Sequence, residues 1–374
     1  MKFFLMIMVY LFVIQLVTYK KSVLNCYTKR GNVNTLLFFS MGLLLLLNCL
    51  RSLETGNDTI SYYSLFEHYK GTSNDYSVAA LLWMDSYIDI GYRMINKLFL
   101  KLSDNYQLFI STIAVFMYCA VNRYIKKYSC NAVYSVFLFF LLFFHVYLNM
   151  LRQALAISII LLGIHYLFEN KKIRFIVIVL IATLFHKTAI IALLLLPIAY
   201  KKHFSISKSI VTIGLAIVLT FSGGISKILE IIGYSGKYIT EENGISTYAG
   251  IVLSSIVLLC MLFVSRKNIN RENLLDGGDN IYARFYIRIP VIQVIISIAS
   301  LALPILYRCE YYFTIFYLAG IPYFLMNSDD SKSNRRVIGT FILIVYSVYM
   351  AGILLLRPEW YSEFQYHFFW MYKR

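Results

Sequence analysis

The chain has 374 residues, of which 59% are hydrophobic and only 14% are charged. Because ordinary soluble domains carry roughly a quarter charged residues, this composition excludes a soluble enzyme, a disordered chain and a secreted disulfide scaffold. The apolar runs are continuous rather than alternating, which excludes a membrane β-barrel. The sequence therefore predicts an all-α fold, that of a polytopic helical integral membrane protein.

Apolar segments of near-membrane length recur along the chain. A spanning helix needs about 20 apolar residues, so the sequence predicts about 12 transmembrane helices in a single transmembrane domain over residues 1–374. The first segment is interpreted as a retained span because Lys20 and Lys21 follow it in place of a small-residue cleavage site. The predicted spans are 2–18, 34–50, 106–122, 131–149, 152–168, 173–186, 188–200, 207–222, 246–265, 285–303, 305–326 and 337–356.

Two of these spans, 173–186 and 188–200, meet near His186. As one helix, residues 173–200 would be about 42 Å long, which exceeds a hydrocarbon core of about 30 Å. Two short helices also keep the basic residues at both ends of the pair on one side of the membrane. The sequence therefore predicts a break near His186, and irregular backbone is tolerated at such a point where it lines a cavity.

The net charge of +16 arises from 35 basic and 19 acidic residues. More than half of the basic residues fall in six short clusters in alternate loops, among them 123–127, 171–174 and 332–336. Basic residues gather in cytoplasmic loops, so these loops are predicted to face the cytoplasm and both termini to face outward. The same placement argues against a nucleic-acid partner.

Two of the outward loops are long, at residues 51–105 and 223–245. The first contains an amphipathic stretch, DIGYRMINKLFLKLSDN, and the second contains ISKILEIIGY. Both stretches are predicted to form amphipathic helices that lie on the membrane surface. The apolar residues at helical spacing in the first stretch are Ile90, Met94, Leu98 and Leu102.

Isolated cations stand at the predicted outer ends of spans, against the charge pattern of the other loops. Charges at membrane depth are expensive and usually face a cavity or a pathway, and arginine suits bidentate recognition of phosphate. One interpretation is therefore a pocket for a lipid phosphate or diphosphate. The other is that the arginines snorkel to the headgroups and that the histidine only packs. The cations are Arg51, Arg152, His186, Lys187, Arg308 and Arg357.

Outward carboxylates are the candidates for acid–base chemistry, and the first long loop supplies them. Asp58 follows Arg51 closely, with Gly56 permitting a tight turn between them, and Asp89 opens the amphipathic stretch. These two aspartates are favoured, whereas Glu67 and Asp75 are interpreted as part of a solvated face of the loop. The chain has no P-loop, GxSxG, HExxH or dinucleotide fingerprint, and its cysteines form no CxxC pair, so neither a cofactor nor a metal is predicted.

Five segments occur in order over roughly residues 35–325 and share a predicted placement at the outer leaflet. They are RSLETGNDTISYYSLF at 51–66, DIGYRMINKLF at 89–99, NMLRQALAISI at 149–159, LIATLFHKTAII at 180–191 and YRCEYYFTIFYLAGIP at 307–322. Together they resemble the EpsG family, within the wider Wzy-type polysaccharide polymerases of bacteria.

The resemblance implies an enzyme that joins oligosaccharide repeat units carried on undecaprenyl diphosphate, at the outer face of the bacterial cytoplasmic membrane, into an O-antigen, capsule or exopolysaccharide. The growing chain moves from its lipid carrier to the nonreducing end of a new lipid-linked unit, and a lipid diphosphate is the leaving group. No nucleotide sugar, ATP or cofactor is implied. The implied partners are the lipid-linked oligosaccharide, membrane lipids and, from the same pathway, a flippase and a chain-length regulator.

The resemblance places Arg51, Arg152, His186 and Arg308 at motif positions, and Tyr311 and Tyr312 accompany Arg308. Physical chemistry suggests roles for the candidate residues. Arg152 and Arg308 would stabilise the negative charge that develops on the departing diphosphate. His186 would contact the diphosphate or accept the proton of the acceptor hydroxyl, and Asp58 or Asp89 is the rival base. The predicted catalytic residues are thus Arg152, His186, Arg308, Asp58 and Asp89. The predicted diphosphate-binding residues are Arg51, Arg152, Gln153, Lys187, Arg308, Tyr311, Tyr312 and Arg357.

Two other functions stay open at the level of the sequence. A flippase or transporter for the same lipid-linked sugars also needs a cationic cavity, but it would open to both faces, whereas the polar intramembrane residues here cluster at the outer ends. A polysaccharide ligase, or another lipid-dependent glycosyltransferase, shares the donor and the leaving group and differs only in its acceptor.

Overall fold

The regular structure of the protein is helical. The computed structural model describes residues 2–18, 30–71, 88–200, 206–222, 245–269, 281–304, 306–328 and 330–371. Within these ranges there is no β-strand, and one isolated antiparallel bridge joins Arg51 to Phe368. The predicted all-α fold is therefore confirmed.

The chain divides into two compact units. The first comprises residues 1–166, 173–190 and 346–374, and the second comprises residues 167–172 and 191–345. The single transmembrane domain inferred from the sequence stays a prediction, and each unit is described by itself.

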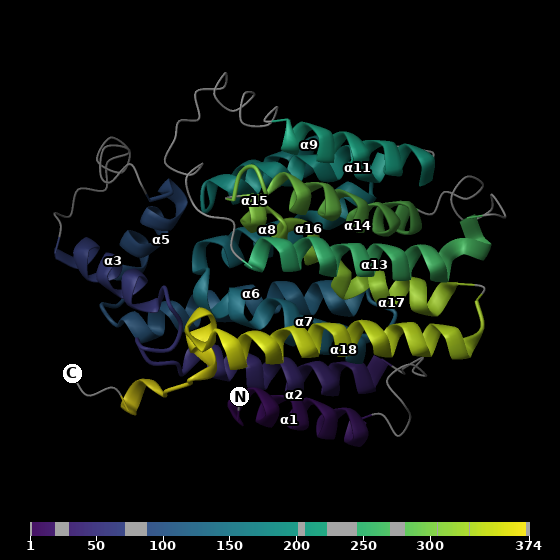
Figure 1. The fold of residues 1–374 in the computed structure, drawn as a ribbon. Coiled ribbons are helices and arrows are strands. Elements are labelled where there is room, and N and C mark those ends of the chain that lie inside the picture. The colour runs from purple at the N-terminus through teal and green to yellow at the C-terminus, as the bar shows by residue number, and fades with distance from the viewer. Residues whose placement is uncertain are drawn as a thin grey trace. The chain divides into compact units, whose positions relative to one another are not determined.

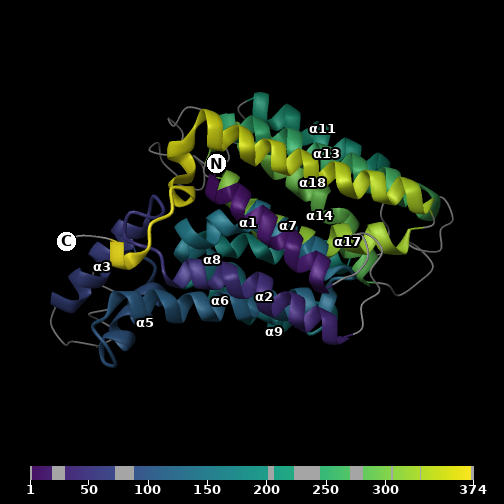
Figure 2. The same cartoon turned by 90° about the horizontal axis from the view of Figure 1, so that it is seen from below.

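The first unit is a bundle in which α2 packs against α1, α6 and α7 (Figure 1). The same neighbours lie side by side in the second view (Figure 2). Asparagine side chains begin two of these helices, because Asn105 accepts from the main-chain N–H of Leu108 and Asn131 from that of Tyr134, both at 3.1 Å. The elements are α1 (Lys2–Thr18), α2 (Arg30–Cys49), α3 (Thr59–Gly71), α5 (Ile90–Leu100), α6 (Tyr106–Tyr128), α7 (Ala132–Asn149), most of α8 (Leu151–Phe168) and α9 (Lys172–Thr183), and the 3₁₀ helices η2 (Pro358–Phe364) and η3 (Phe369–Met371).

The second unit is built around α14, which packs against α10, α11, α13 and α17. One predicted span, 305–326, is interrupted rather than continuous, and this corrects the prediction of a single helix there. Main-chain bonds such as Phe316 N to Phe313 O and Leu318 N to Ile315 O reach back only three residues, so the helix tightens and breaks. The elements are the end of η1 (Lys187–Leu194), α10 (Leu195–Tyr200), α11 (Ile206–Phe221), α13 (Ile245–Ile269), α14 (Ile281–Ala299), α15 (Leu306–Cys309), α16 (Tyr311–Thr314), α17 (Tyr317–Asn327) and most of α18 (Lys332–Leu356).

Six helices among the described residues are long and apolar enough to cross a membrane, by length and composition. They lie at Tyr106–Tyr128, Ala132–Asn149, Leu151–Phe168, Tyr248–Arg266, Ile281–Ala299 and Lys332–Leu356. Four shorter apolar helices add Lys2–Thr18, Val33–Cys49, Lys187–Tyr200 and Lys208–Phe221. The protein is thus a helical membrane protein, while the count of about 12 spans stays a prediction.

The predicted break near His186 is confirmed. Helix α9 ends at Thr183, and η1 begins at Lys187 with three-residue hydrogen bonds such as Ala189 N to His186 O at 2.9 Å. The chain therefore changes from one helix to another within the apolar sequence around His186, which leaves this side chain at a helix end.

The amphipathic stretch in the first long loop forms α5, but its faces are inverted relative to a water-soluble helix. Met94, Leu98 and Leu102 are 41%, 54% and 85% exposed, while Asn96 on the opposite side is buried, as is Lys97. An apolar outer stripe suits contact with lipid, and a polar inner face suits an internal site. The predicted loop 223–245 and its helix lie almost entirely outside the described residues, as do residues 72–87 of the first loop.

Candidate functional site

Three ionisable side chains from three separate segments meet in the first unit, and we call Asp89, Arg152 and His186 the ionic cluster. Arg152 Nη1 donates to Asp89 Oδ2 at 2.9 Å, and His186 Nδ1 lies 3.7 Å from the same oxygen. The side chain of Asp89 is 6% exposed, against 16% for His186 and 24% for Arg152. A nearly buried carboxylate therefore lies between two partly accessible basic groups.

A glycine brings the ionic cluster together. Gly91, in the first turn of α5, donates its N–H to Leu184 O just beyond α9 at 2.7 Å. A Cβ at residue 91 would lie 2.8 Å from that same oxygen, which is closer than a real side chain tolerates. Only glycine lets α5 dock on this helix end, and the docking sets Asp89 beside His186.

Asp89 occupies the N-cap of α5 without capping the helix. Its side chain makes no hydrogen bond to the first turn, although aspartate at this position normally accepts one from an N–H there. The carboxylate is directed to Arg152 instead. Arg152 itself lies in the first turn of α8, where the helix dipole disfavours a cation, so Asp89 supplies the negative charge that this position needs.

Tyr62, from α3, extends the polar surroundings of Arg152. Tyr62 is 7% exposed, and burial raises the pKa of its hydroxyl while Arg152 beside it opposes the rise. Because the net shift is upward, the phenol stays protonated at neutral pH and can donate a hydrogen bond. Asp58, which is exposed, lies near enough for its charge to raise the pKa of Tyr62. Asp58 thus lies at the border of the ionic cluster.

Two further cations were not singled out in the sequence. Arg93 and Lys97 are 5% and 3% exposed on α5. They follow Asp89 by four and eight residues, which places all three on one face of the helix. The four-residue spacing is the signal that could have found them, but the sequence prediction rested on the apolar stripe on the neighbouring face of the same stretch.

Arg51 lies in a different environment within the same unit. It is 0% exposed, and its Nη1 donates to Asn48 O at 3.1 Å and to the Asn48 side chain. Its neighbours pair with the C-terminal segment, because Ser52 N donates to His367 O at 2.8 Å and Phe369 N to Leu50 O at 2.9 Å. Arg51 therefore closes the end of α2 in the structure, and its predicted contact with a diphosphate stays a prediction.

The remaining candidates are dispersed. Gln153 is buried beside Arg152, Lys187 is exposed beside His186, and Arg357 is exposed with its Nη1 3.7 Å from Glu359. Arg308 belongs to the second unit, where it is exposed and its Nε donates to the Tyr307 hydroxyl at 3.3 Å. The joint role of Arg308 and Arg152 at the diphosphate stays a prediction, as do the roles of Tyr311, half-buried, and Tyr312, buried.

No group of three or more His, Cys, Asp or Glu side chains in the described ranges could hold a metal ion. The arrangement instead offers anion recognition at Arg152 and proton acceptance at His186 beside the Asp89 carboxylate. These are the two capacities that a transfer reaction with an anionic leaving group requires.

A family model described as the EpsG family matches residues 34–368, which is nearly the whole chain. The chain belongs to the EpsG family. The resemblance inferred from the sequence motifs is thereby confirmed. No curated protein and no solved structure matches the chain. EpsG is a Wzy-type polymerase-like family, so membership indicates a polysaccharide-polymerase type of role for this membrane protein.

The EpsG match includes every residue of the ionic cluster. The motifs at 51–66, 89–99 and 149–159 belong to the first unit, as does the motif at 180–191 except for its last residue, while the motif at 307–322 belongs to the second. Three of the four first-unit motifs each contribute one member of the cluster. Motifs that are separate in the EpsG sequence thus supply a single polar site.

Proposed function

We propose that this EpsG-family protein polymerises undecaprenyl-diphosphate-linked oligosaccharide repeat units into a surface polysaccharide, at the outer face of the bacterial cytoplasmic membrane. The observation that carries the proposal is the shared Asp89 oxygen, with Arg152 at 2.9 Å and His186 at 3.7 Å. Family membership and the apolar helices support it. A chain-length regulator and a flippase of the same pathway would be the protein's partners.

The proposed step transfers a glycosyl group. A hydroxyl oxygen of the acceptor unit attacks C1 of the donor sugar, and the C1–O bond to the lipid diphosphate breaks. The new C1–O bond is the glycosidic linkage, the hydroxyl proton passes to a base, and the diphosphate leaves with the bonding electron pair. Because the sugar–diphosphate bond supplies the driving force, the step needs neither ATP nor a nucleotide sugar.

Arg152 is the residue we assign to the departing diphosphate. Its guanidinium has five N–H donors, and Nε has no hydrogen-bond partner in the described part of the chain. Donors thus remain for phosphate oxygens beyond the bond to Asp89. Negative charge grows on those oxygens as the C1–O bond breaks, and a preorganised cation in a site of low dielectric stabilises it.

His186 is the residue we assign to the acceptor proton, with Asp89 as its orienting carboxylate. Neither ring nitrogen of His186 has a hydrogen-bond partner among the described residues, so one can face a hydroxyl while the other faces Asp89. A carboxylate on the far side stabilises the imidazolium that forms on proton uptake. The 3.7 Å separation is long for a hydrogen bond, and such contacts tighten when substrate binds.

The outward orientation rests on the helix ends. Arg152 lies in the first turn of α8, and the basic residues 171–174 follow the other end of that helix. Helix α6 runs from Tyr106 to a basic end at Lys126 and Lys127, about 30 Å away at 1.5 Å per residue. Under the positive-inside rule, the basic ends are cytoplasmic, so the opposite ends of these helices and the cluster face outward. This orientation agrees with the proposed topology of about 12 spans.

Gene deletion with complementation, followed by sizing of the surface polysaccharide, tests the proposal. Loss of the protein should leave single repeat units at the surface, and the wild-type gene should restore long chains. Lipid-linked units trapped in the cytoplasm would indicate a flippase instead. Long chains that stay lipid-linked and unattached to their final acceptor would indicate a ligase.

A further inference from the structure

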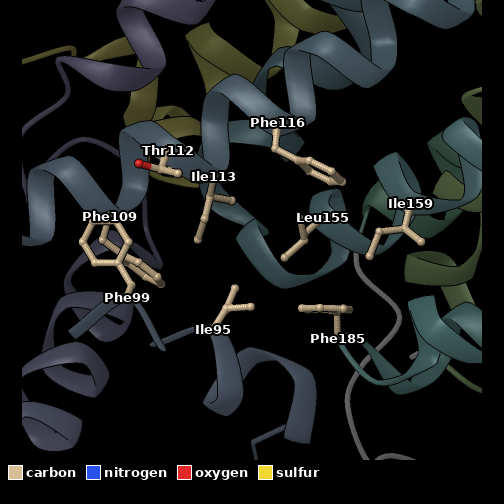
Figure 3. A pocket seen from close by; sticks show the side chains of 9 residues that line it. All are labelled: Ile95, Phe99, Phe109, Thr112, Ile113, Phe116, Leu155, Ile159 and Phe185. Atoms are coloured by element: carbon tan, nitrogen blue, oxygen red, sulfur yellow. The ribbon is translucent and has the colours of Figure 1, made fainter. Parts of the chain in front are cut away.

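An apolar pocket of about 270 Å³ lies within the first unit. Side chains from α5, α6, α8 and the segment after α9 point into it from opposite sides (Figure 3). Its lining contains one polar side chain, a threonine, and four phenylalanines. The lining residues are Ile95, Phe99, Phe109, Thr112, Ile113, Phe116, Leu155, Ile159 and Phe185.

The pocket adjoins the ionic cluster along the chain. Phe185 immediately precedes His186, and Leu155 follows Arg152 by three residues on α8. Residues three and seven apart lie on one face of a helix, so Leu155 and Ile159 continue the face of Arg152 over about 10 Å. Ile95 lies on α5 beyond Asp89. Three of the segments that line the pocket therefore also carry one residue of the ionic cluster each.

At its other end the pocket is bordered by exposed side chains of α6. Phe109, Ile113 and Leu155 are 1%, 7% and 5% exposed, whereas Phe116 is 40% exposed and Thr112 is exposed as well. Neighbouring apolar side chains on α6, such as Val115, are exposed too. In a membrane this face meets lipid chains, so a chain can enter the pocket from the bilayer without crossing water.

We propose that this pocket holds the first isoprenoid units of the donor's lipid while Arg152 binds the diphosphate, an inference that rests on the proposed function. The combination of a cation and an adjacent dry pocket fits an amphiphile with an anionic head. An apolar cavity of about 150 Å³ holds benzene, so 270 Å³ accommodates roughly two five-carbon isoprene units. The phenylalanines match a methyl-branched, unsaturated chain better than a polar one.

The pocket acts by orienting the donor rather than by attracting it. A lipid chain is already in an apolar solvent, so moving it into an apolar pocket gains little from the hydrophobic effect. Holding the first units beside Arg152 instead fixes the direction of the C1–O bond relative to His186. The expected signature is therefore discrimination between lipid chains of different length, with a larger effect on kcat than on KM.

A pocket-filling variant tests this inference with two donors. Ile159→Trp adds bulk about 10 Å from Arg152, which is beyond the reach of a single isoprene unit. The purified full-length protein should prefer a donor with three or more isoprene units over a one-unit donor by about tenfold or more in kcat/KM. Ile159→Trp should abolish that preference by slowing only the longer donor. Val115→Trp, on the exposed face of α6 outside the lining, should keep it. An unchanged preference in Ile159→Trp would overturn the inference.

Photo-crosslinking separates this inference from the proposed function. The probe is a polyprenyl diphosphate with a diazirine in its second isoprene unit. It should label peptides of α5, α6 or α8 that contain lining residues, and excess unlabelled polyprenyl diphosphate should compete, whereas a phospholipid should not. Labelling of these peptides in a protein without polymerase activity would support the lipid pocket and contradict the proposed function. Polymerase activity together with labelling elsewhere, or with competition by phospholipid, would contradict the assignment of this pocket to the donor's lipid.

Discussion

Two arginines in the first unit, Arg51 and Arg152, come from the same sequence pattern, an isolated cation at the end of an apolar span. Arg51 is 0% exposed and bonds to Asn48, three residues earlier in α2. Arg152 is 24% exposed and bonds to a carboxylate 63 residues away. Arg51 Nη1 thus bonds within its own helix, while Arg51 Nε and Nη2 are buried without a hydrogen-bond partner among the described residues. Arg152 instead reaches a distant segment and stays partly exposed.

The helix dipole explains the difference. Arg51 follows the C-terminus of α2, where a cation is favoured and can bond to the last carbonyl groups. Arg152 lies at the N-terminus of α8, where a cation is disfavoured and an anion must compensate. That compensation brings Asp89, and with it His186, to one place. An arginine at a helix C-terminus can therefore cap its own helix, whereas an arginine at a helix N-terminus needs an anionic partner and can form a site with it.

The largest effect is expected at His186. His186→Leu removes the proposed base, so the transfer rate should fall by about 10²–10⁴-fold at unchanged protein abundance. His186→Gln should retain part of the activity if the ring only donates a hydrogen bond to the diphosphate. Polymer length and protein level, measured together, check this. Normal chain length from His186→Leu at normal abundance would remove the residue from the site.

Replacing Arg152 with lysine is the next largest change. Lysine keeps the charge but loses the planar fork, so Arg152→Lys should slow transfer by about 10²-fold with intact lipid-linked substrate. The comparison variant is Arg51→Lys, which should not change kcat of the folded protein. Equal losses of kcat from both substitutions would end the distinction between the two arginines.

A methyl group at Gly91 should disturb the cluster without touching a charge. Gly91→Ala places a Cβ 2.8 Å from Leu184 O, so α5 must shift and Asp89 with it. We expect a loss of about 1–3 kcal/mol of stability together with reduced transfer by the folded protein. Gly42→Ala is the matched control, because nothing lies within 4 Å of its Cβ. Thermal unfolding and initial rates measure the two effects, and identical behaviour of both variants would contradict the docking role.

The smallest catalytic effect is expected at Arg51. Arg51→Met removes the bonds to Asn48 and leaves buried acceptors unsatisfied, which should destabilise the protein by about 1–3 kcal/mol. The folded fraction should still transfer at nearly the wild-type rate. Detergent-solubilised protein, assayed for thermal stability and specific activity, provides the measurement. A stable Arg51→Met protein without activity would place Arg51 in the site after all.

Much of the helical framework could be predicted because continuous apolar runs have few alternatives to helix in lipid. The break near His186 followed from the length of the segment and from the basic residues at both of its ends. The interruption of 305–326 was not predicted, because the segment was interpreted as one span although Arg308 and Glu310 lie where α15 ends and α16 begins, and its tightened turns depend on packing. The burial of the polar face of α5 was missed as well, because a helix that lies on the membrane surface would turn its polar face to water.

The members of the site were predictable one by one, but their assembly was not. Arg152 and His186 stood out as charges in apolar surroundings, and Asp89 as one of two favoured carboxylates. Asp89 and His186 were predicted as rival bases, whereas the structure places them beside each other. Their proximity depends on the bond between Gly91 and Leu184, which joins segments more than 90 residues apart and has no sequence pattern.

The most direct test of the central claim is a double-mutant cycle between Asp89 and His186 on the initial rate of transfer by purified protein. If the two side chains act as one acid–base unit, Asp89→Asn, His186→Gln and the double variant should all lose rate to a similar extent, about 10²-fold. Independent residues would instead multiply their losses to about 10⁴-fold in the double variant. Similar losses in all three proteins are the predicted result, and multiplied losses would contradict the account.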